Sequence, residues 1–445
     1  MMKRTCCPGF TGLPHYLGFV FVGLLPLTLP AADPTFWKDV QPILQKACAE
    51  CHRSGEIGPM PLTNFKEARP WAASMKEAVK TRRMPPWFAD PHFGKFGNDR
   101  SLSEQEITTI TTWAEKGAPE GSAKDAPVPR EFNDGWNIET PDLVLQMPQA
   151  FKIGAKEKVD YQYVILPTGF TEDKWVRMSE TRPSDRAVVH HMVVFARDPK
   201  SSWLRDVKPG VPFVPDQPGS AINIGGGGNE IIAVYTPGMV PDMWKSNQAR
   251  LIKAGSDLVL QVHYTPSGKD TQDQTKVGLV FAKEPPTERI ISTQISNSRF
   301  LIPAGDANYE VKAGTRLPAN VKILSFFPHM HLRGKDYEYK AIYPTGEESV
   351  LLKVPAYNFN WQLAYRPAVE LDIPAGTRIE GVAHFDNSAN NPANPDPKAN
   401  VKFGEQSWEE MAIGFIDIAI PANVDPRVYL RPAPQAPRPP AAPQP

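Results

Sequence analysis

The stretch DLVLQVHY, Asp257–Tyr264, shows the pattern that decides the fold. Successive side chains of a strand point to opposite faces, so its alternating apolar residues predict a strand with one buried face. These residues are Leu258, Leu260 and Val262. His263 falls on the other face. Similar segments occur at 159–166 (VDYQYVIL) and 321–327 (VKILSFF), separated by turn-forming residues. We therefore expect all-β sandwiches over residues 138–425.

The composition indicates an ordinary globular protein with several domains. The chain has 445 residues, 49 basic and 49 acidic, so its net charge is zero and nothing favours a nucleic-acid partner. Proline is abundant, with 48 residues, and part of it lies in the stretch RPAPQAPRPPAAPQP. We expect residues 426–445 to form a disordered tail.

The N-terminus has the pattern of a secretory signal. Lys3 and Arg4 precede an apolar run over 17–29, and small residues follow at 31–32. We expect residues 1–32 to be cleaved and the protein to be periplasmic or secreted, with no membrane span afterwards. Two of the four cysteines precede the apolar run and would be removed with it. The mature chain would then be free of disulfides other than a pairing within one C-x-x-C motif.

That motif is Cys48, Cys51 and His52, a C-x-x-C-H sequence. In an exported protein it is typical of covalent haem attachment, with the thiols joined to haem and the histidine bound to iron. A zinc half-site and a redox dithiol are the alternatives. Zinc needs four ligands and no second cysteine pair is present. A redox dithiol usually opens a helix in a βαβ unit, and no such pattern surrounds this one. We expect one haem c.

Helical signals flank the motif. A helix is expected from Asp39, and a second after Ser103, which forms a capping box with Glu106 and ends before Gly117. Residues 36–122 resemble small c-type cytochromes, which implies an all-α cytochrome domain over 33–122. A linker over 123–137 would follow.

Several residues are candidates for the sixth iron ligand. Met84 follows a helix and precedes two prolines, as a distal methionine of a cytochrome c does, and we favour it. Met60, Met75 and His92 are the other candidates, and the absence of a sixth ligand is a further alternative. Met75 lies in a helical run, where a methionine is commonly part of the core.

Five of nine histidines lie in three short strings: His190 and His191, His263, and His329 and His331. The last two are two residues apart, so on a strand they share a face and could bind one metal. Adjacent histidines on a regular strand face opposite ways, so the first pair could share a metal only at a twisted end or a bulge. A single strand histidine is usually only a hydrogen-bonded polar residue; three strings together favour metal binding.

These strings resemble the copper type II, ascorbate-dependent monooxygenases, the family of peptidylglycine α-hydroxylating monooxygenase and dopamine β-monooxygenase. The matching segments are AVVHHMVVF, DLVLQVHYTPSG, PHMHLRGKDY and QSWEEMAIGFIDI. The resemblance implies that His190, His191 and His263 bind one copper. It implies that His329, His331 and Met411 bind a second, where O₂ reacts. It also implies two jelly-roll sandwiches, 138–285 and 286–425, each with one copper and facing across an open cleft. Met411 could instead be a core residue.

The chain departs from the family pattern on the substrate side. Phe327, Ile413 and Phe415 stand where the peptide-amidating enzymes have groups that hold a carboxylate, and Ala412 replaces a bonded cysteine. An apolar wall cannot bind a carboxylate, so an apolar or aromatic small substrate is expected. His384 could be an extra ligand or proton donor; we favour a role in ordering the loop after it by hydrogen bonding.

The sequence thus predicts an exported copper monooxygenase that hydroxylates a C–H bond with O₂. Electrons would come through the fused haem from a donor that the sequence does not identify. Because the cytochrome region precedes the first copper region, we expect electrons to reach the His190 copper first and the Met411 copper second. The alternative is a non-catalytic haem and copper electron-transfer or copper-binding protein. A monooxygenase couples O₂ uptake to product, whereas a carrier only changes its redox state.

Overall fold

The computed structural model describes residues 32–54, 56–132, 135–215 and 229–430. The residues from Pro34 onward belong to one compact unit. The expected signal peptide and most of the proline-rich tail lie outside the described residues. In the described part of the chain, no helix has the length and apolar character needed to cross a membrane.

The first part of the described chain contains short helices separated by loops. Both expected helices are present: the first begins earlier, at Phe36, and the second has the predicted capping box of Ser103 and Glu106. The helices are η1 Phe36–Val40, α1 Gln41–Ala47, α2 Phe65–Ala68, η2 Arg69–Trp71, α3 Ala72–Lys80, α4 Glu104–Glu115 and η3 Ala123–Asp125. They pack around buried Phe36 and Trp113. Helices this few and short do not by themselves identify a cytochrome c fold.

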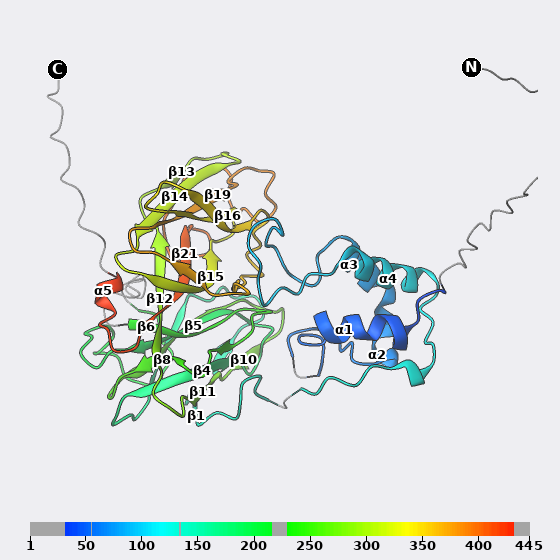
Figure 1. The fold of residues 1–445 in the computed structure, drawn as a ribbon, viewed down its shortest axis with the longest axis horizontal. Helices are drawn as coiled ribbons and strands as arrows, with labels where there is room; N and C mark the ends of the chain where they lie inside the picture. The colour runs from blue at the N-terminus through cyan, green and yellow to red at the C-terminus, as the bar shows by residue number, and fades with distance from the viewer. Residues whose placement is uncertain (1–31, 55, 133–134, 216–228, 431–445) are drawn as a thin grey trace, which may run out of the picture. The chain divides into compact units, whose positions relative to one another are not determined.

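The remaining described residues are almost entirely β (Figure 1). The first half contains β1 Leu143–Gln146, β2 Phe151–Ile153, β3 Gln162–Pro167, β4 Lys174–Arg182, β5 Val189–Arg197, β6 Asn229–Tyr235, β7 Asp242–Met243, β8 Gln248–Ile252, β9 Asp257–Tyr264, β10 Thr271–Asp273 and β11 Lys276–Phe281. The second half contains β12 Glu288–Ser296, β13 Leu301–Ile302, β14 Tyr309–Arg316, β15 Val321–His329, β16 Gly334–Ile342, β17 Glu348–Val354, β18 Leu371–Ile373, β19 Arg378–Phe385, β20 Val401–Lys402 and β21 Ile413–Pro421, then helix α5 Arg427–Leu430.

Two four-stranded sheets and one long sheet form two sandwiches. The long sheet has the order β1-β11-β4-β8-β12-β21-β15-β18, with β7 paired to β4. The sheet β3-β9-β5-β6 belongs to the first half, and β14-β19-β16-β17 belongs to the second. Strands β8 and β12 pair in parallel, so the long sheet continues from one half into the other. The two sandwiches are therefore joined by backbone hydrogen bonds.

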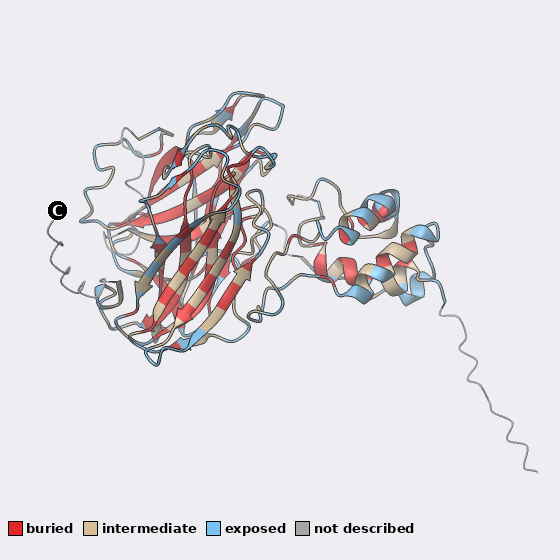
Figure 2. Ribbon diagram, turned by 90° about the horizontal axis from the view of Figure 1, so that it is seen from above, coloured by how far each residue is buried: buried red, intermediate tan, exposed pale blue. Residues whose placement is uncertain are grey.

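Each sandwich has its own apolar core (Figure 2). In β9 the alternation predicted from the sequence is confirmed: Leu258, Leu260 and Val262 are fully buried in the first core, and His263 lies on the opposite face. That opposite face also holds Tyr161, Tyr163 and Phe195, and Phe415 of the second half packs against them. The metal-ligand candidates thus lie where the two sandwiches meet.

Candidate metal centre

A β-bulge brings His190 and His191 to the same place. Strands β5 and β9 pair with a register shift between Val189 and His191, and His191 stands directly opposite His263. The extra residue in the bulge is His190, whose side chain is thereby turned toward its neighbour. The sequence expectation that these two residues need a bulge is confirmed.

The ring nitrogens of the three histidines converge. One ligand nitrogen from each of His190, His191 and His263 lies within 4.8 Å of the other two, and in the described residues no other trio of His, Cys, Asp or Glu does so. The Nδ1 atoms of His190 and His191 are 3.0 Å apart. Two imidazoles bound at right angles to one first-row metal ion would place their nitrogens about 2.9 Å apart. The buried Nδ1 of His263 has no hydrogen-bond partner. These three residues fit a metal ion bound through Nδ1 atoms.

Aromatic residues hold the three rings in place. The hydroxyl of Tyr161 is 3.0 Å from Nε2 of His191, and the Tyr161 ring stacks on His263 at 4.8 Å. When Nε2 donates to the Tyr161 oxygen, Nδ1 of His191 is left unprotonated and able to bind a metal. Phe359, from the second sandwich, stacks on His190 at 4.4 Å.

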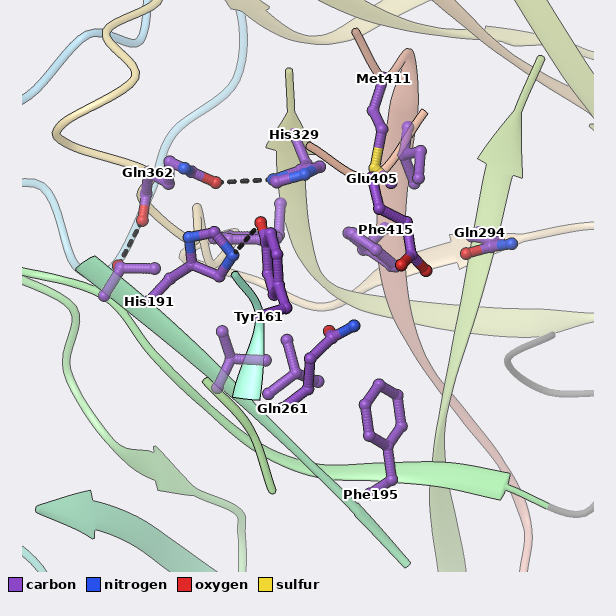
Figure 3. Close-up of a pocket in the computed structure, with 15 residues that line it drawn as sticks. Tyr161, His191, Phe195, Gln261, Gln294, His329, Gln362, Glu405, Met411 and Phe415 are labelled. Carbon is purple, nitrogen blue, oxygen red and sulfur yellow. Dashed lines mark hydrogen bonds between the residues drawn. The ribbon is translucent and has the colours of Figure 1, made fainter. Parts of the chain in front are cut away.

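The second set lies at the end of β15. His329 is its last residue and is paired with Ile413, while His331 follows two residues later; their rings lie 5.2 Å apart. Met411 precedes β21 and lines the same cavity as His329, into which its sulfur extends (Figure 3). Nδ1 of His329 donates to the side-chain oxygen of Gln362 at 2.7 Å, and Nδ1 of His331 donates to a backbone carbonyl. Both Nε2 atoms are then free of protons, and that of His331 is buried without a partner.

The buried side chain of Glu410 fixes the backbone of the second set. Glu410 accepts hydrogen bonds from the backbone N–H of His331 at 2.8 Å and of Arg333 at 2.6 Å. It directly precedes Met411, so one side chain joins the H-x-H segment to the methionine. Burial raises the pKa of Glu410 to about 8, and the backbone donors oppose the rise.

All five imidazoles are neutral at pH 7. Burial lowers the pKa of His190 and of His329 to about 4 and that of His263 to about 3. Burial also holds the pKa values of His191 and His331 well below their ordinary range. The neutral ring is the form that binds a metal ion, so the site needs no deprotonation to accept one.

The two sets lie side by side instead of facing each other across an open cleft. The rings of His191 and His329 are 5.9 Å apart. The cavity beside them is small, with a volume of about 60 Å³. Its walls include Phe195 and Phe415, which Figure 3 labels, and also Phe327. The expectation of an open cleft is therefore wrong for this structure, because the paired β8 and β12 and these aromatic side chains bring the sandwiches together.

The C-x-x-C-H motif lies at the end of α1. Nδ1 of His52 donates to the carbonyl of Met60 at 3.1 Å, which leaves Nε2 free to bind iron. Cys48 and Cys51 are free thiols. Burial raises the pKa of Cys48 to about 12, whereas a reactive dithiol needs a lowered thiol pKa. Such a raised pKa disfavours a redox dithiol, and covalent haem attachment stays a prediction.

The candidates for the sixth iron ligand differ in their surroundings. Met75 is buried in the helical core, as a structural methionine would be, and Met60 packs at the edge of that core. His92 points to solvent, with 84% of its side chain exposed, and is hydrogen-bonded to Asp90. Met84 is half-buried after α3. These surroundings disfavour His92, and Met84 stays a prediction.

His384 lies away from both sets. It belongs to β19, where Nδ1 is 2.7 Å from Asp336 of β16 and Nε2 is 3.6 Å from Glu310 of β14. The following loop is held instead by the buried amide of Asn387, which donates to two backbone carbonyls. The expectation that His384 orders this loop is wrong, because strand pairing directs its side chain to acidic neighbours.

Two residues of the site, Gln362 and Phe359, had no signal in the sequence, and a third, Glu410, lay in a matching segment without a predicted role. Glu410 stands within the E-M segment, but its role depends on backbone groups 77 and 79 residues away. Gln362 and Phe359 lie in a loop without any motif. They could be found only once the fold placed this loop against the histidines.

Comparisons with known proteins add little. No family model and no curated protein matches the chain. Among solved structures, PNGF-II is 10% identical with a TM-score of 0.26, covering 62% of this chain and 65% of that chain, just under two thirds of its length. The infectious bursal disease virus VP2 subviral particle is 8% identical with a TM-score of 0.18, covering 69% of this chain and 77% of that chain. Likenesses of this size support no argument about function.

Proposed function

We propose that the protein is an exported copper-dependent monooxygenase that hydroxylates a C–H bond with O₂ and receives electrons through its own c-type haem. One observation supports this most strongly: His190, His191 and His263 form one ligand set, His329, His331 and Met411 form a second, unlike set, and the two sets meet at a cavity that His191, His329 and Met411 line. A simple electron carrier needs only one such set. In this proposal residues 33–122 form a cytochrome c domain, and 138–285 and 286–425 are jelly-roll sandwiches.

The two sets suit different oxidation states. Three imidazoles from His190, His191 and His263 accept both Cu(I) and Cu(II), so this copper could pass electrons on. A thioether is a soft ligand that favours Cu(I), the state that binds O₂, so the set with Met411 is the proposed oxygen site. Bound copper would supply one-electron and O₂ chemistry there.

The protein's own residues would orient the ligands and exclude water. Gln362 and Glu410 fix the two histidines of the second set, and Tyr161 fixes His191. Phe327 and Phe415 form an apolar wall beside Met411. We propose a small substrate whose apolar part lies against this wall. The polar side chains of the same cavity would contact its remainder; they include Gln261 and Gln294.

The test is oxygen incorporation. The copper- and haem-loaded protein, reduced without air, is mixed with ¹⁸O₂ and a metabolite pool, and products are analysed by mass spectrometry. A product heavier by one ¹⁸O atom supports the proposal. Oxidation of the metals with no labelled product, across pools rich in small aromatic and aliphatic compounds, would contradict it.

The second candidate is a haem and copper electron-transfer protein. The small volume of the cavity, about 60 Å³, favours it, because an electron carrier needs no room for a substrate. The same experiment separates the two candidates, since a carrier returns all electrons to an acceptor and incorporates no oxygen.

A further inference from the structure

A small polar cavity connects the C-x-x-C-H motif to the β region. Cys51 lines it together with Arg186, Tyr235 and Thr236, and its volume is about 50 Å³. Burial raises the pKa of Cys51, and the positive charges of Arg100 and Arg186 oppose the rise, so both arginines lie near the sulfur. The cavity therefore places the end of β6 next to the proposed haem attachment site.

Thr236 also lines the cavity of the histidines. It is the residue after β6, and only 1% of its surface is exposed. Its hydroxyl donates to the backbone carbonyl of Gln362 at 2.5 Å. Thr236 thus lines both cavities, and its hydroxyl is hydrogen-bonded to the loop that contains Gln362.

Gln362 completes the connection. Its side-chain oxygen accepts from Nδ1 of His329 at 2.7 Å, as Figure 3 shows. Its neighbour Trp361 packs on Gly238, which lines the cavity of Cys51. A Cβ atom at Gly238 would lie 3.2 Å from the indole ring of Trp361 and 3.7 Å from the guanidinium of Arg100. Trp361 therefore contacts the cavity of Cys51, and the next residue, Gln362, is hydrogen-bonded to His329.

We propose that Thr236 and Gln362 form the contact through which an electron passes from the C-x-x-C-H site to His329, so that the Met411 set is reduced first. This rests on the proposed function. The step transfers one electron: ferrous haem becomes ferric and Cu(II) becomes Cu(I). No proton moves and no bond breaks. The order is the reverse of the one expected from the succession of domains in the sequence.

A second route leads to the three-histidine set. Tyr235 lines the cavity of Cys51 and pairs with Met192, which adjoins His191. That route reaches His191 through its backbone. The route through Thr236 instead ends in a hydrogen bond from the ring of His329, the part of the residue that would bind the metal.

Three variants test the contact. Thr236→Val keeps the shape of the side chain and removes its hydroxyl, whereas Thr236→Ser keeps the hydroxyl. Thr168→Val is the matched control, because the Thr168 hydroxyl also donates to a buried backbone carbonyl, that of Ser256, at 2.6 Å. The haem- and copper-loaded protein, with both coppers as Cu(II), receives one electron per chain from dithionite under nitrogen. Haem absorbance follows its reoxidation, and EPR follows the loss of Cu(II).

We expect Thr236→Val to slow haem reoxidation about tenfold, with the copper content and the initial EPR spectrum unchanged. Thr236→Ser and Thr168→Val should match the unaltered protein. Equal rates in Thr236→Val and Thr168→Val would overturn the contact while leaving the proposed function intact. Absence of bound copper would instead overturn both, and metal analysis distinguishes these cases.

The order of the two sets is tested separately. His263→Ala removes a ligand of the first set only, and His331→Ala removes one of the second set only. We expect fast haem reoxidation to persist in His263→Ala and to disappear in His331→Ala, with the starting haem spectra alike. The opposite pattern would show that the three-histidine set receives the electron first and would overturn the proposal.

Discussion

The imidazole rings of His191 and His329 lie 5.9 Å apart, although they belong to different sandwiches. The relationship follows from the backbone: β8 pairs with β12 across the junction, and Phe415 of the second sandwich packs on the first. Two metal ions bound at these rings would need no long protein path between them. The entry point for electrons can then be whichever set lies nearer the haem.

Metal content is the first prediction. The C-x-x-C-H motif and the two histidine sets predict one covalent haem and two coppers per chain. A pyridine haemochrome assay and elemental analysis of the purified exported protein should give a copper-to-iron ratio of about two, the ratio that complete occupancy of both sets requires. Little copper after reconstitution would contradict the assignment of both sets.

Replacement of the methionine is the second prediction. Met411→Leu keeps nearly the same volume and removes the sulfur, so the fold should persist while the second set loses its soft ligand. We expect about one copper to remain bound at His190, His191 and His263, and oxidation of the reduced protein by O₂ to become much slower. Loss of both coppers, measured by elemental analysis, would mean that Met411 is structural. Unchanged O₂ reactivity would mean that it is not a ligand.

Removal of the buried carboxyl group of Glu410 is the third prediction. Glu410→Ala leaves the N–H groups of His331 and Arg333 without their acceptor, which costs about 1–3 kcal/mol for each unpaired buried donor. The variant should unfold at lower denaturant concentration and bind less copper at the second set. Glu409→Ala is the control, since it changes the neighbouring acidic residue without touching these two donors. Similar losses in both variants would exclude a specific role for Glu410.

Much of this site followed from sequence pattern. The period of two in β9 predicted a sandwich strand and the outward face of His263, and the adjacency of His190 and His191 predicted a bulge. These are local properties, because the alternation of side chains and the need for an extra residue follow from the backbone alone. The capping box of α4 was predicted for the same reason.

What the sequence did not predict depends on contacts between distant segments. The two sandwiches are held together by the pairing of β8 with β12 and by aromatic packing at their junction. No local sequence pattern predicts either contact. Thr236 and Gln362 are 126 residues apart, and neither lies in a motif. His384 was assigned to the loop that follows it because neighbours along the chain are visible in a sequence, whereas its cross-strand acidic partners are not.

The fourth prediction concerns the capping box of α4 and its pH dependence. Burial opposes ionisation of Glu106, but hydrogen bonds from Lys46 and Ser103 outweigh it and hold the pKa below its ordinary value. Because the folded-state pKa is lower than the unfolded one, the ionised side chain stabilises the fold at neutral pH. This stabilisation is lost as the pH falls below about 4.3. Ser103→Ala should cost about 1 kcal/mol at pH 7.

The measurement is thermal unfolding followed by circular dichroism at several pH values. Glu106→Gln should lower the midpoint at pH 7, and the difference from the unaltered protein should shrink as the pH is lowered toward 3. Ser122→Ala, at the start of the short exposed η3, is the control and should change little. If the midpoint of Glu106→Gln lies below that of the unaltered protein by the same amount at every pH, the charge of Glu106 contributes nothing to stability.

The last prediction concerns the ion network at the junction of the sandwiches. Arg250 of β8 is buried and donates to Asp417 of β21 at 2.8 Å and to Ser292 of β12 at 3.0 Å. Burial opposes ionisation of Asp417, but Arg250 and the hydroxyls of Ser292 and Ser325 outweigh it and keep its pKa low. Arg250→Met removes the cation and leaves a buried carboxylate without its main partner.

The expected cost of Arg250→Met is about 3–5 kcal/mol, the usual effect of breaking a buried ion pair from one side. Denaturant unfolding at pH 7 measures it. Arg427→Met is the matched control, because Arg427 pairs with Asp425 in the same way but at an exposed position, and it should cause no measurable change. The double variant Arg250→Met, Asp417→Asn should recover part of the loss, since no buried charge is then left unpaired at Asp417. If the double variant is as unstable as the sum of the single variants, the two residues are not coupled and the network does not join the sandwiches.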